Sequence, residues 1–384
     1  MDSPTPPAPV ASSRIRALVE RVLIGVFVAM IALPLLVRAL PLDTAFALAE
    51  NRAPAPFPAI ALKGWVLVTF PRRFERYWND SFGLRHLLIR WHSLGKIALG
   101  VSPSPKALIG KEGFLFYTQE RSLEYFRGVT PFTPAELAQW RQALESREAW
   151  LRERGIRFLV VVAPNKETIY PEYMPDVYRP LRPDSRLDQL VDHLRRQRSP
   201  VEVLDLREPL RRAKAQGRIY HRTDTHWNDV GAFVAYGEIL RRIAPWFPDM
   251  RGEPWPADQV VRARPGGDLA RLLALEDRFR EERIDLVPRA SRRARPAVLS
   301  LPTAITNPED WSAFECAGCG GPRVVMYQDS FNTDVAPFLS EHFSRIVYGN
   351  SSRMLVDVIE RERPGLFVHE FVERILMCPG LHSC

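Results

Sequence analysis

Lysine and cysteine are scarce in this 384-residue chain, and both shortages narrow the range of functions. Its 53 cationic residues outnumber 45 carboxylates, but only six of the cations are lysine and they form no tract. No zinc-finger spacing and no aromatic–basic RNA-binding motif accompanies them, so the charge of +8 does not indicate nucleic-acid binding. Apolar residues make up 46% and charged residues 26%, which predicts a folded core and excludes wholesale disorder.

The four cysteines all lie near the C-terminus, at Cys316, Cys319, Cys378 and Cys384. The spacing of the first two is that of half a zinc knuckle, but no second closely spaced pair completes one. Disulfides suit an exported domain, and zinc binding or free thiols are the alternatives. The sequence does not determine which cysteines pair.

Long apolar runs are absent except near the N-terminus, where residues 22–37 are apolar between Arg21 and Arg38. Arginines at the ends of such a run can extend their charges to the membrane surface, so we predict one transmembrane helix over 22–42. A cleaved signal peptide and a buried core helix are the alternatives. By the positive-inside rule, residues 1–21 form a cytoplasmic tail and the rest lies outside the cytoplasmic membrane.

Beyond the apolar run, residues 43–105 are predicted to form a stalk or helical preamble, and 106–384 a folded domain. In this domain amphipathic helices alternate with continuous apolar strands, which predicts an α/β three-layer sandwich with a parallel sheet. Residues 247–322 are rich in Pro and Arg and weakly periodic, so they predict an insertion or lid. The expected strands are 107–109, 114–117, 157–163, 201–206, 323–327, 345–348 and 366–369, and the expected helices are 133–153 (opened by a Thr133/Glu136 capping box), 185–196, 230–243 and 352–362.

Two short phrases carry residues suited to nucleophilic catalysis. Asp224 and His226 are two residues apart and precede a helix that Asn228 or Asp229 would cap. In an extended segment, side chains two residues apart point to the same side. Ser330 follows an apolar strand, where open α/β sheets bind ligands and where the next backbone N–H groups can hold an oxyanion. Together they form a candidate Ser-His-Asp set, although each phrase alone also fits an ordinary loop.

The order of these phrases resembles the alginate O-acetyltransferase family of the AlgJ/AlgX type, which has an SGNH-hydrolase-like domain. The most specific matches are 224–228 (DTHWN) and 163–175 (APNKETIYPEYMP). The other matches are 50–52, 79–85, 110–117 (GKEGFLFY), 267–269 (GDL), 328–331 (QDSF) and 370–376 (EFVERIL). The resemblance implies a triad of Asp224, His226 and Ser330 in a circularly permuted SGNH-hydrolase-like fold, export, and a polysaccharide acceptor.

The oxyanion hole is less well defined, because Gln328 stands where the usual SGNH serine block has glycine. Asn350, after a predicted strand, is our first candidate for the hole, followed by Tyr327 and Asn165. Lys166 is a candidate for contact with an acidic sugar or an acyl donor, and a solvated loop lysine is the alternative.

These expectations combine into a bacterial inner-membrane protein with one membrane span and a periplasmic O-acetyltransferase domain. Ser330 would form an acyl-enzyme, His226 would move protons, and Asp224 would hold the imidazole tautomer, with no metal or organic cofactor required. The acetyl group must cross the membrane, so the resemblance implies a multi-pass MBOAT-type acyltransferase as partner. An acetylesterase with the same triad and a non-catalytic polysaccharide-assembly protein are the alternatives.

Overall fold

The computed structural model describes residues 11–39, 54–58, 64–250, 257–302, 305, 307–351 and 353–381. The chain divides into two compact units. The first comprises Met1–Pro103 with Arg271–Ala274, and the second comprises Ser104–Ala270 with Leu275–Cys384.

The first unit is built on three helices in its described part: α1 (Ala11–Ala39), α3 (Gly64–Asp80) and α4 (Arg85–Ala98). Within α1, Ile15–Pro34 is long and apolar enough to cross a membrane, which fits an anchor or a signal sequence. This stretch begins seven residues before the predicted span of 22–42. Arg16 and Glu20 form an ion pair at 3.3 Å one turn apart at its start. Residues 40–42 of the predicted span lie outside the described residues.

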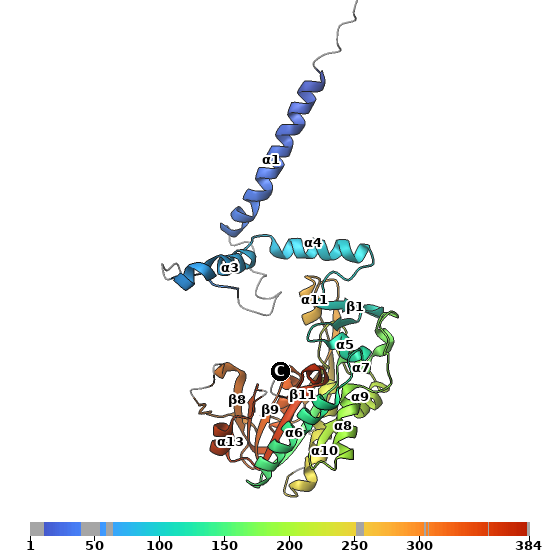
Figure 1. Cartoon of the computed structure of the whole chain (residues 1–384), viewed down its shortest axis with the longest axis vertical. Coiled ribbons are helices and arrows are strands. Elements are labelled where there is room, and N and C mark those ends of the chain that lie inside the picture. The colour runs from blue at the N-terminus through green and yellow to red at the C-terminus, as the bar shows by residue number, and fades with distance from the viewer. Residues whose placement is uncertain are drawn as a thin grey trace, which may run out of the picture. The chain divides into compact units, whose positions relative to one another are not determined.

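A mixed sheet organises the second unit (Figure 1). It has seven strands in the order β4-β3-β11-β9-β10-β8-β7. The first five strands are parallel, and β8 and β7 form an antiparallel edge. Strand β11, from the C-terminal part of the chain, lies between β3 and β9 and pairs with β3 along its whole length. The strands are β3 (Arg157–Ala163), β4 (Val203–Asp205), β7 (Arg295–Pro296), β8 (Trp311–Glu315), β9 (Gly321–Tyr327), β10 (Phe343–Gly349) and β11 (Leu366–Val372).

Helices cover both faces of this sheet, because its central strands are apolar on both sides. On one face, Val161 and Met326 join a core cluster with α9 (Arg207–Lys214) and α10 (Asp229–Ile243). On the other face, Val160 and Tyr327 join a second cluster with α6 (Pro134–Arg152), α8 (Arg186–Arg196) and α13 (Val356–Glu362). The three-layer α/β sandwich predicted from the sequence is confirmed.

The start of α6 shows how local sequence sets these boundaries. Thr133 Oγ1 accepts the N–H of Glu136 at 3.2 Å, and the Glu136 carboxylate accepts the N–H of Thr133 at 2.8 Å. These reciprocal bonds satisfy backbone donors that the first helical turn leaves open, and Pro134 needs none. The predicted capping box is confirmed.

The range 247–322 is more varied than a single insertion. Its hairpin β5 (Ala257–Arg264) and β6 (Glu281–Pro288) pairs only with itself, whereas β7 and β8 extend the main sheet. A lid therefore stays a prediction for the part outside the sheet.

The remaining elements are β1 (Ala107–Ile109), β2 (Leu115–Tyr117), α5 (Ser122–Arg127), α7 (Lys166–Ile169), α11 (Asp268–Leu272), α12 (Ala336–Leu339) and the 3-10 helices η1 (Lys111–Gly113), η2 (Pro171–Tyr173), η3 (Ala244–Trp246), η4 (Pro308–Asp310), η5 (Ser330–Asp334) and η6 (Glu373–Met377).

The cysteines form disulfides where the structure describes them. Cys316 and Cys319 are joined to each other in the connection between β8 and β9. Cys378 is also disulfide-bonded, and Cys384 lies outside the described residues. Of the three alternatives that the sequence left open, the disulfide is the one found.

Candidate active site

The Asp-Thr-His phrase lies in a tight loop that leads into α10. Tyr220 and Trp227 form an antiparallel bridge across this loop. Asn228 then caps the helix, since its Oδ1 accepts the N–H groups two and three residues further on, each at 3.1 Å. Of the two caps that the sequence allowed, Asn228 is therefore the one used.

Two buried ionic side chains hold the backbone of the loop. The Glu281 carboxylate, from β6, accepts the N–H groups of Arg222 at 2.5 Å and Thr223 at 3.2 Å. Lys166 Nζ donates to three loop carbonyls at 3.1, 3.1 and 2.6 Å, those of His221, Arg222 and Asp224. Because buried backbone groups need partners, these contacts fix the conformation of the loop that carries Asp224 and His226.

Asp224, His226 and Ser330 form a continuous hydrogen-bonded series. Asp224 Oδ1 lies 2.8 Å from His226 Nδ1, and His226 Nε2 lies 2.8 Å from Ser330 Oγ. The serine is exposed at the start of η5, and two residues separate it from the end of β9. Buried Trp227 also joins the two phrases, because its Nε1 donates to the Phe331 carbonyl at 2.9 Å. This geometry allows an imidazole to take a proton from the serine hydroxyl.

Asp224 and His226 move each other's pKa in opposite directions. Burial alone would raise the pKa of Asp224, but the hydrogen bond and charge of His226 outweigh it and hold this pKa well below its usual range. Burial alone would lower the pKa of His226, but the hydrogen bond and charge of Asp224 outweigh it and raise this pKa above its usual 6.5. A carboxylate bonded in this way stabilises a protonated imidazole over a neutral one.

The step from Gly267 to Asp268 packs directly on Asp224. Asp268 N–H donates to Asp224 Oδ2 at 3.0 Å, and the Asp268 carboxylate accepts the N–H of Thr225 at 2.7 Å. Burial and the neighbouring Asp224 charge raise the pKa of Asp268. The two carboxylates and His226 have potential metal-ligand atoms within 4.8 Å of one another. Because the carboxylates already accept these N–H groups and the imidazole, we assign them to a hydrogen-bond network.

We expect Gly267→Ala to lower turnover of an activated acetyl ester by about 100-fold, the effect of a misplacement of about 1 Å. An added Cβ would lie 2.5 Å from Asp224 Cβ and 2.6 Å from its Oδ2, so Asp224 would have to move. Steady-state kinetics measures the loss, and circular dichroism checks the fold. Gly217→Ala is the matched control, since its Cβ meets nothing within 4 Å. Equal turnover in both variants would contradict the need for this close approach.

Buried carboxyl groups also surround the serine loop. Asp329 Oδ1 accepts the N–H of Phe331 at 2.9 Å, and its Oδ2 accepts the N–H of Val372 at 2.7 Å. Glu370 accepts the N–H of Asp329 at 3.1 Å, and burial raises the pKa of both acids. The N–H of Phe331, which the sequence suggested for an oxyanion, is therefore already engaged within the protein.

Asn165 lies at the carboxyl end of β3 and is 2% exposed. Its Oδ1 accepts from Arg374 Nη1 at 3.1 Å, and its N–H donates to Glu373 at 2.9 Å. Its Nδ2 has no hydrogen-bond partner in the part of the chain that the structure describes. The Arg374 guanidinium lies 5.8 Å from the ring centroid of Phe331, the residue after Ser330. Asn165 thus offers an amide donor two contacts away from the serine loop.

The structure places the three other sequence candidates in different surroundings. Lys166 is 2% exposed, and burial lowers its pKa to about 8, so it positions the loop and does not face a sugar. Tyr327 points to the α6 face, where its hydroxyl accepts the N–H of Leu355 at 2.9 Å and burial raises its pKa to about 12. Asn350 is exposed beyond β10, and the hydrogen bonds described for the three triad candidates do not involve it.

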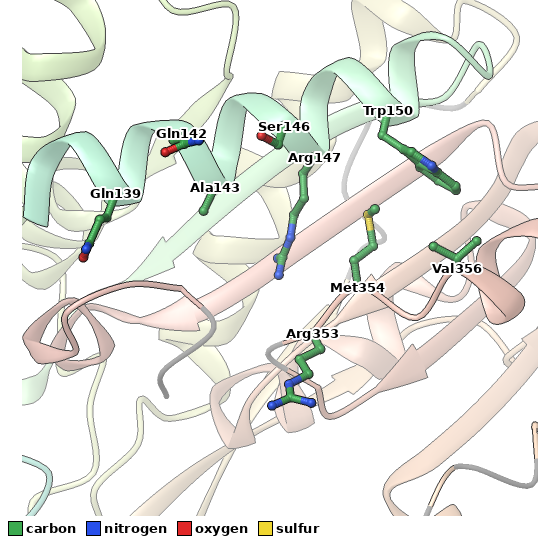
Figure 2. A pocket seen from close by; sticks show the side chains of 9 residues that line it. All are labelled: Gln139, Gln142, Ala143, Ser146, Arg147, Trp150, Arg353, Met354 and Val356. Carbon is green, nitrogen blue, oxygen red and sulfur yellow. The ribbon is translucent and has the colours of Figure 1, made fainter.

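A separate cavity of about 640 Å³ lies between α6 and the segment that leads into α13 (Figure 2). Arg147 points into it from the helix, with Nη1 2.9 Å from His369 Nδ1. The cavity is on the α6 side of the sheet, whereas Trp227 and Phe331 pack on the α10 side, so we do not assign it to the triad. It is lined by Gln139, Gln142, Ala143, Ser146, Arg147, Trp150, Arg353, Met354 and Val356.

Comparison with known proteins connects this geometry to a family. Residues 107–300 match the model of the SGNH hydrolase-like domain of acetyltransferase AlgX. The chain is similar to the probable alginate O-acetylase AlgJ of Pseudomonas syringae pv. tomato, with 28% identity over 207 residues, covering 53% of this chain and 51% of that protein. The probable alginate O-acetylase AlgJ of Pseudomonas aeruginosa is 27% identical over 274 residues, which cover 63% of this chain and 64% of that protein.

Both matches span less than two thirds of the relative's length. Among solved structures, PatB1 of Bacillus cereus is similar with a TM-score of 0.52 and 15% identity, covering 70% of this chain and 96% of that one. At this identity the likeness concerns the fold, and it agrees with the three-layer sandwich described above.

Proposed function

The chain belongs to the family of the SGNH hydrolase-like domain of acetyltransferase AlgX, and from this membership we propose that it is an extracytoplasmic O-acetyltransferase acting on an exopolysaccharide. The observation that carries the proposal is the hydrogen-bonded series of Asp224, His226 and Ser330. Relatives named as probable alginate O-acetylases support a polysaccharide hydroxyl as the acceptor.

In the proposed first half-reaction, Ser330 Oγ attacks the carbonyl carbon of an acetyl ester. His226 Nε2 takes the hydroxyl proton, and the tetrahedral intermediate collapses to acetyl-serine when the ester oxygen leaves with a proton from the imidazolium. Asp224 holds Nδ1–H of the imidazole and stabilises its cation. The short distances between these three side chains support their roles.

In the second half-reaction, a sugar hydroxyl attacks the acetyl-serine. His226 takes the proton of that hydroxyl and returns it to Ser330 Oγ, so the acetyl group moves to the sugar and the enzyme is restored. If water replaces the sugar, the same steps give an esterase. Exclusion of water from the acyl-enzyme would therefore decide between the two activities.

We further propose that α1 is an uncleaved anchor and that the second unit lies in the periplasm. Its apolar stretch Ile15–Pro34 supports the anchor, and the disulfide at Cys316 and Cys319 supports an oxidising compartment. An acetyl donor made in the cytoplasm must cross the membrane. A multi-pass acyltransferase of the MBOAT type is the partner we propose for that step.

For the oxyanion we propose Asn165 in place of Asn350. Its Nδ2–H₂ group is buried without a hydrogen-bond partner among the described residues, and Arg374 fixes the amide orientation through Oδ1. A preorganised amide of this kind stabilises the negative oxygen of the tetrahedral intermediate more than it stabilises the substrate.

We expect Asn165→Asp to lower kcat for an acetyl ester by about 10²-fold, the usual effect of losing one oxyanion donor. Aspartate keeps the volume and an oxygen for Arg374 but cannot donate from the second atom. Asn350→Asp is the matched control, since Asn350 is exposed and should leave kcat unchanged. If the two variants have equal kcat values, Asn165 is not a donor to the reaction.

The experiment that tests the function offers the purified full-length protein an activated acetyl ester together with neutral or acidic oligosaccharides. Mass spectrometry of the sugars then detects acetyl transfer. Acetylated sugar is the expected product. Release of acetate without acetylated sugar would identify an acetylesterase, and no reaction with either acceptor would favour a non-catalytic assembly protein.

A further inference from the structure

Helix α4 of the first unit exposes the side that a helix in a soluble protein normally buries. Leu87, Leu88 and Trp91 are 48%, 53% and 70% exposed. On another side of the same helix, Ser93 is 2% exposed. Surface helices usually turn apolar side chains to the core and polar ones to water, so the orientation of α4 calls for an apolar or interfacial environment.

Helix α3 presents a second apolar face, made of aromatic rings. Phe70, Phe74 and Trp78 are four residues apart and therefore line one side of the helix. Their ring centroids are separated by 5.8 Å and 6.2 Å, and Phe57 packs edge-on against Phe74 at 6.2 Å. Phe57, Phe74 and Trp78 each keep more than a third of their surface exposed, so the cluster remains accessible.

Positive charge accompanies both apolar faces. Residues 64–101 contain six Arg or Lys and two Asp or Glu. Arg72, Arg73 and Arg76 are exposed. At 100° per residue Arg72 and Arg76 lie on the side of α3 opposite Phe74, and Arg73 lies at its flank. Aromatic and aliphatic residues on one side with arginines on the other are typical of helices that lie in a membrane interface.

We propose that α3 and α4 lie in the interfacial region of a bilayer that contains anionic lipid. Their Trp and Leu side chains would enter the boundary between headgroups and acyl chains, and their arginines would pair with lipid phosphates. Continuity with α1 selects this occupant over a protein partner, because Ile15–Pro34 is long and apolar enough to span a membrane and α3 follows α1 in the chain. The proposal does not depend on acetyl transfer.

The test reconstitutes the full-length chain in nanodiscs of phosphatidylcholine and phosphatidylglycerol with brominated acyl chains, which quench nearby tryptophans. Because α1 contains no Trp, its insertion alone adds no quenching. We expect bromine to quench part of the emission, Trp91→Phe to remove a share of that quenching, and Trp78→Phe to remove a further share. Trp150→Phe, on α6 of the other unit, is the matched control and should leave the bromine-sensitive emission unchanged.

Besides this chain the nanodiscs contain only their scaffold protein, so a surface meant for a protein partner would leave Trp78 and Trp91 unquenched. That result, or equal quenching in the wild type and in the double variant Trp78→Phe/Trp91→Phe, would overturn the proposal. Turnover of a soluble acetyl ester should be the same in all variants. A failure of the membrane proposal is therefore distinguishable from a failure of the proposed enzymatic function.

Discussion

Replacing Ser330 by alanine is expected to lower p-nitrophenyl acetate turnover and acetyl transfer by about 10⁶-fold, as loss of the serine does in other Ser-His-Asp sets. The variant keeps the loop but lacks the oxygen that lies 2.8 Å from His226 Nε2. Without that oxygen no acyl-enzyme forms, and residual rate comes only from binding and charge stabilisation. Initial-rate measurements with each substrate quantify the loss.

The fold of the Ser330→Ala variant should remain intact. Ser330 is exposed, and the bond that its hydroxyl makes to His226 contributes about 1 kcal/mol to the free energy of unfolding. Thermal denaturation therefore should change little. Thr333→Ala, an exposed position in the same 3-10 helix, is the matched control and should keep wild-type activity. Wild-type turnover in Ser330→Ala would remove this serine from the mechanism.

Asp224→Asn should lower kcat by about 10⁴-fold, less than the roughly 10⁶-fold loss expected for His226→Ala. The amide can no longer hold His226 in the tautomer that accepts the serine proton. It also removes the charge that stabilises the imidazolium, whereas His226→Ala removes the proton carrier itself. Kinetics of both variants alongside the wild type give the ranking.

The pH profile separates this role from a purely structural one. His226 must be neutral to accept a proton, and its pKa is raised, so wild-type kcat/KM should fall as pH drops through a value above 6.5. In Asp224→Asn the raising hydrogen bond and charge are lost and burial remains, so the acidic limb should move to lower pH. An unchanged rate and profile would mean that Asp224 only anchors the loop.

Much of the fold could be predicted because it follows from local pattern. Strand β3 occupies the predicted residues 157–163, because a short continuous apolar run between a glycine and a proline favours a buried strand. The capping residues fixed the start of α6, and Asn228 fixed the start of α10. Strands β7 and β8 were missed, because short edge strands in a Pro-rich stretch have no marked periodicity.

The three hydrogen-bonded candidates of the site could be predicted from the sequence, but the residues that support them could not. Asp224, His226 and Ser330 have recognisable side chains at recognisable positions. Glu281 acts through backbone bonds to a loop that lies 58 and 59 residues away in the chain, and no local pattern reveals such contacts. Gly267 lies in a segment that resembles the family. The lack of space for a Cβ at this position becomes visible only in the structure, where Asp224 packs against it.

The directions of two side chains, those of Lys166 and Tyr327, could not be predicted for a similar reason. Lys166 follows a strand, where a lysine usually reaches solvent, and only the three carbonyls of the distant loop explain its burial. Tyr327 ends β9, and alternation along the strand turns it toward α6 and away from the α10 face. Residue type alone therefore could not distinguish residues that would contact a substrate from residues that hold the site in place.

Mass spectrometry of the intact and digested protein, after brief exposure to an activated acetyl ester, tests the proposed serine acyl-enzyme most directly. We expect one acetyl group on the peptide that carries Ser330. This group should be absent in Ser330→Ala and should be lost from the wild type when an acceptor sugar is added. An active protein that carries no acetyl group, or carries it only on another residue, would contradict a serine acyl-enzyme at this site.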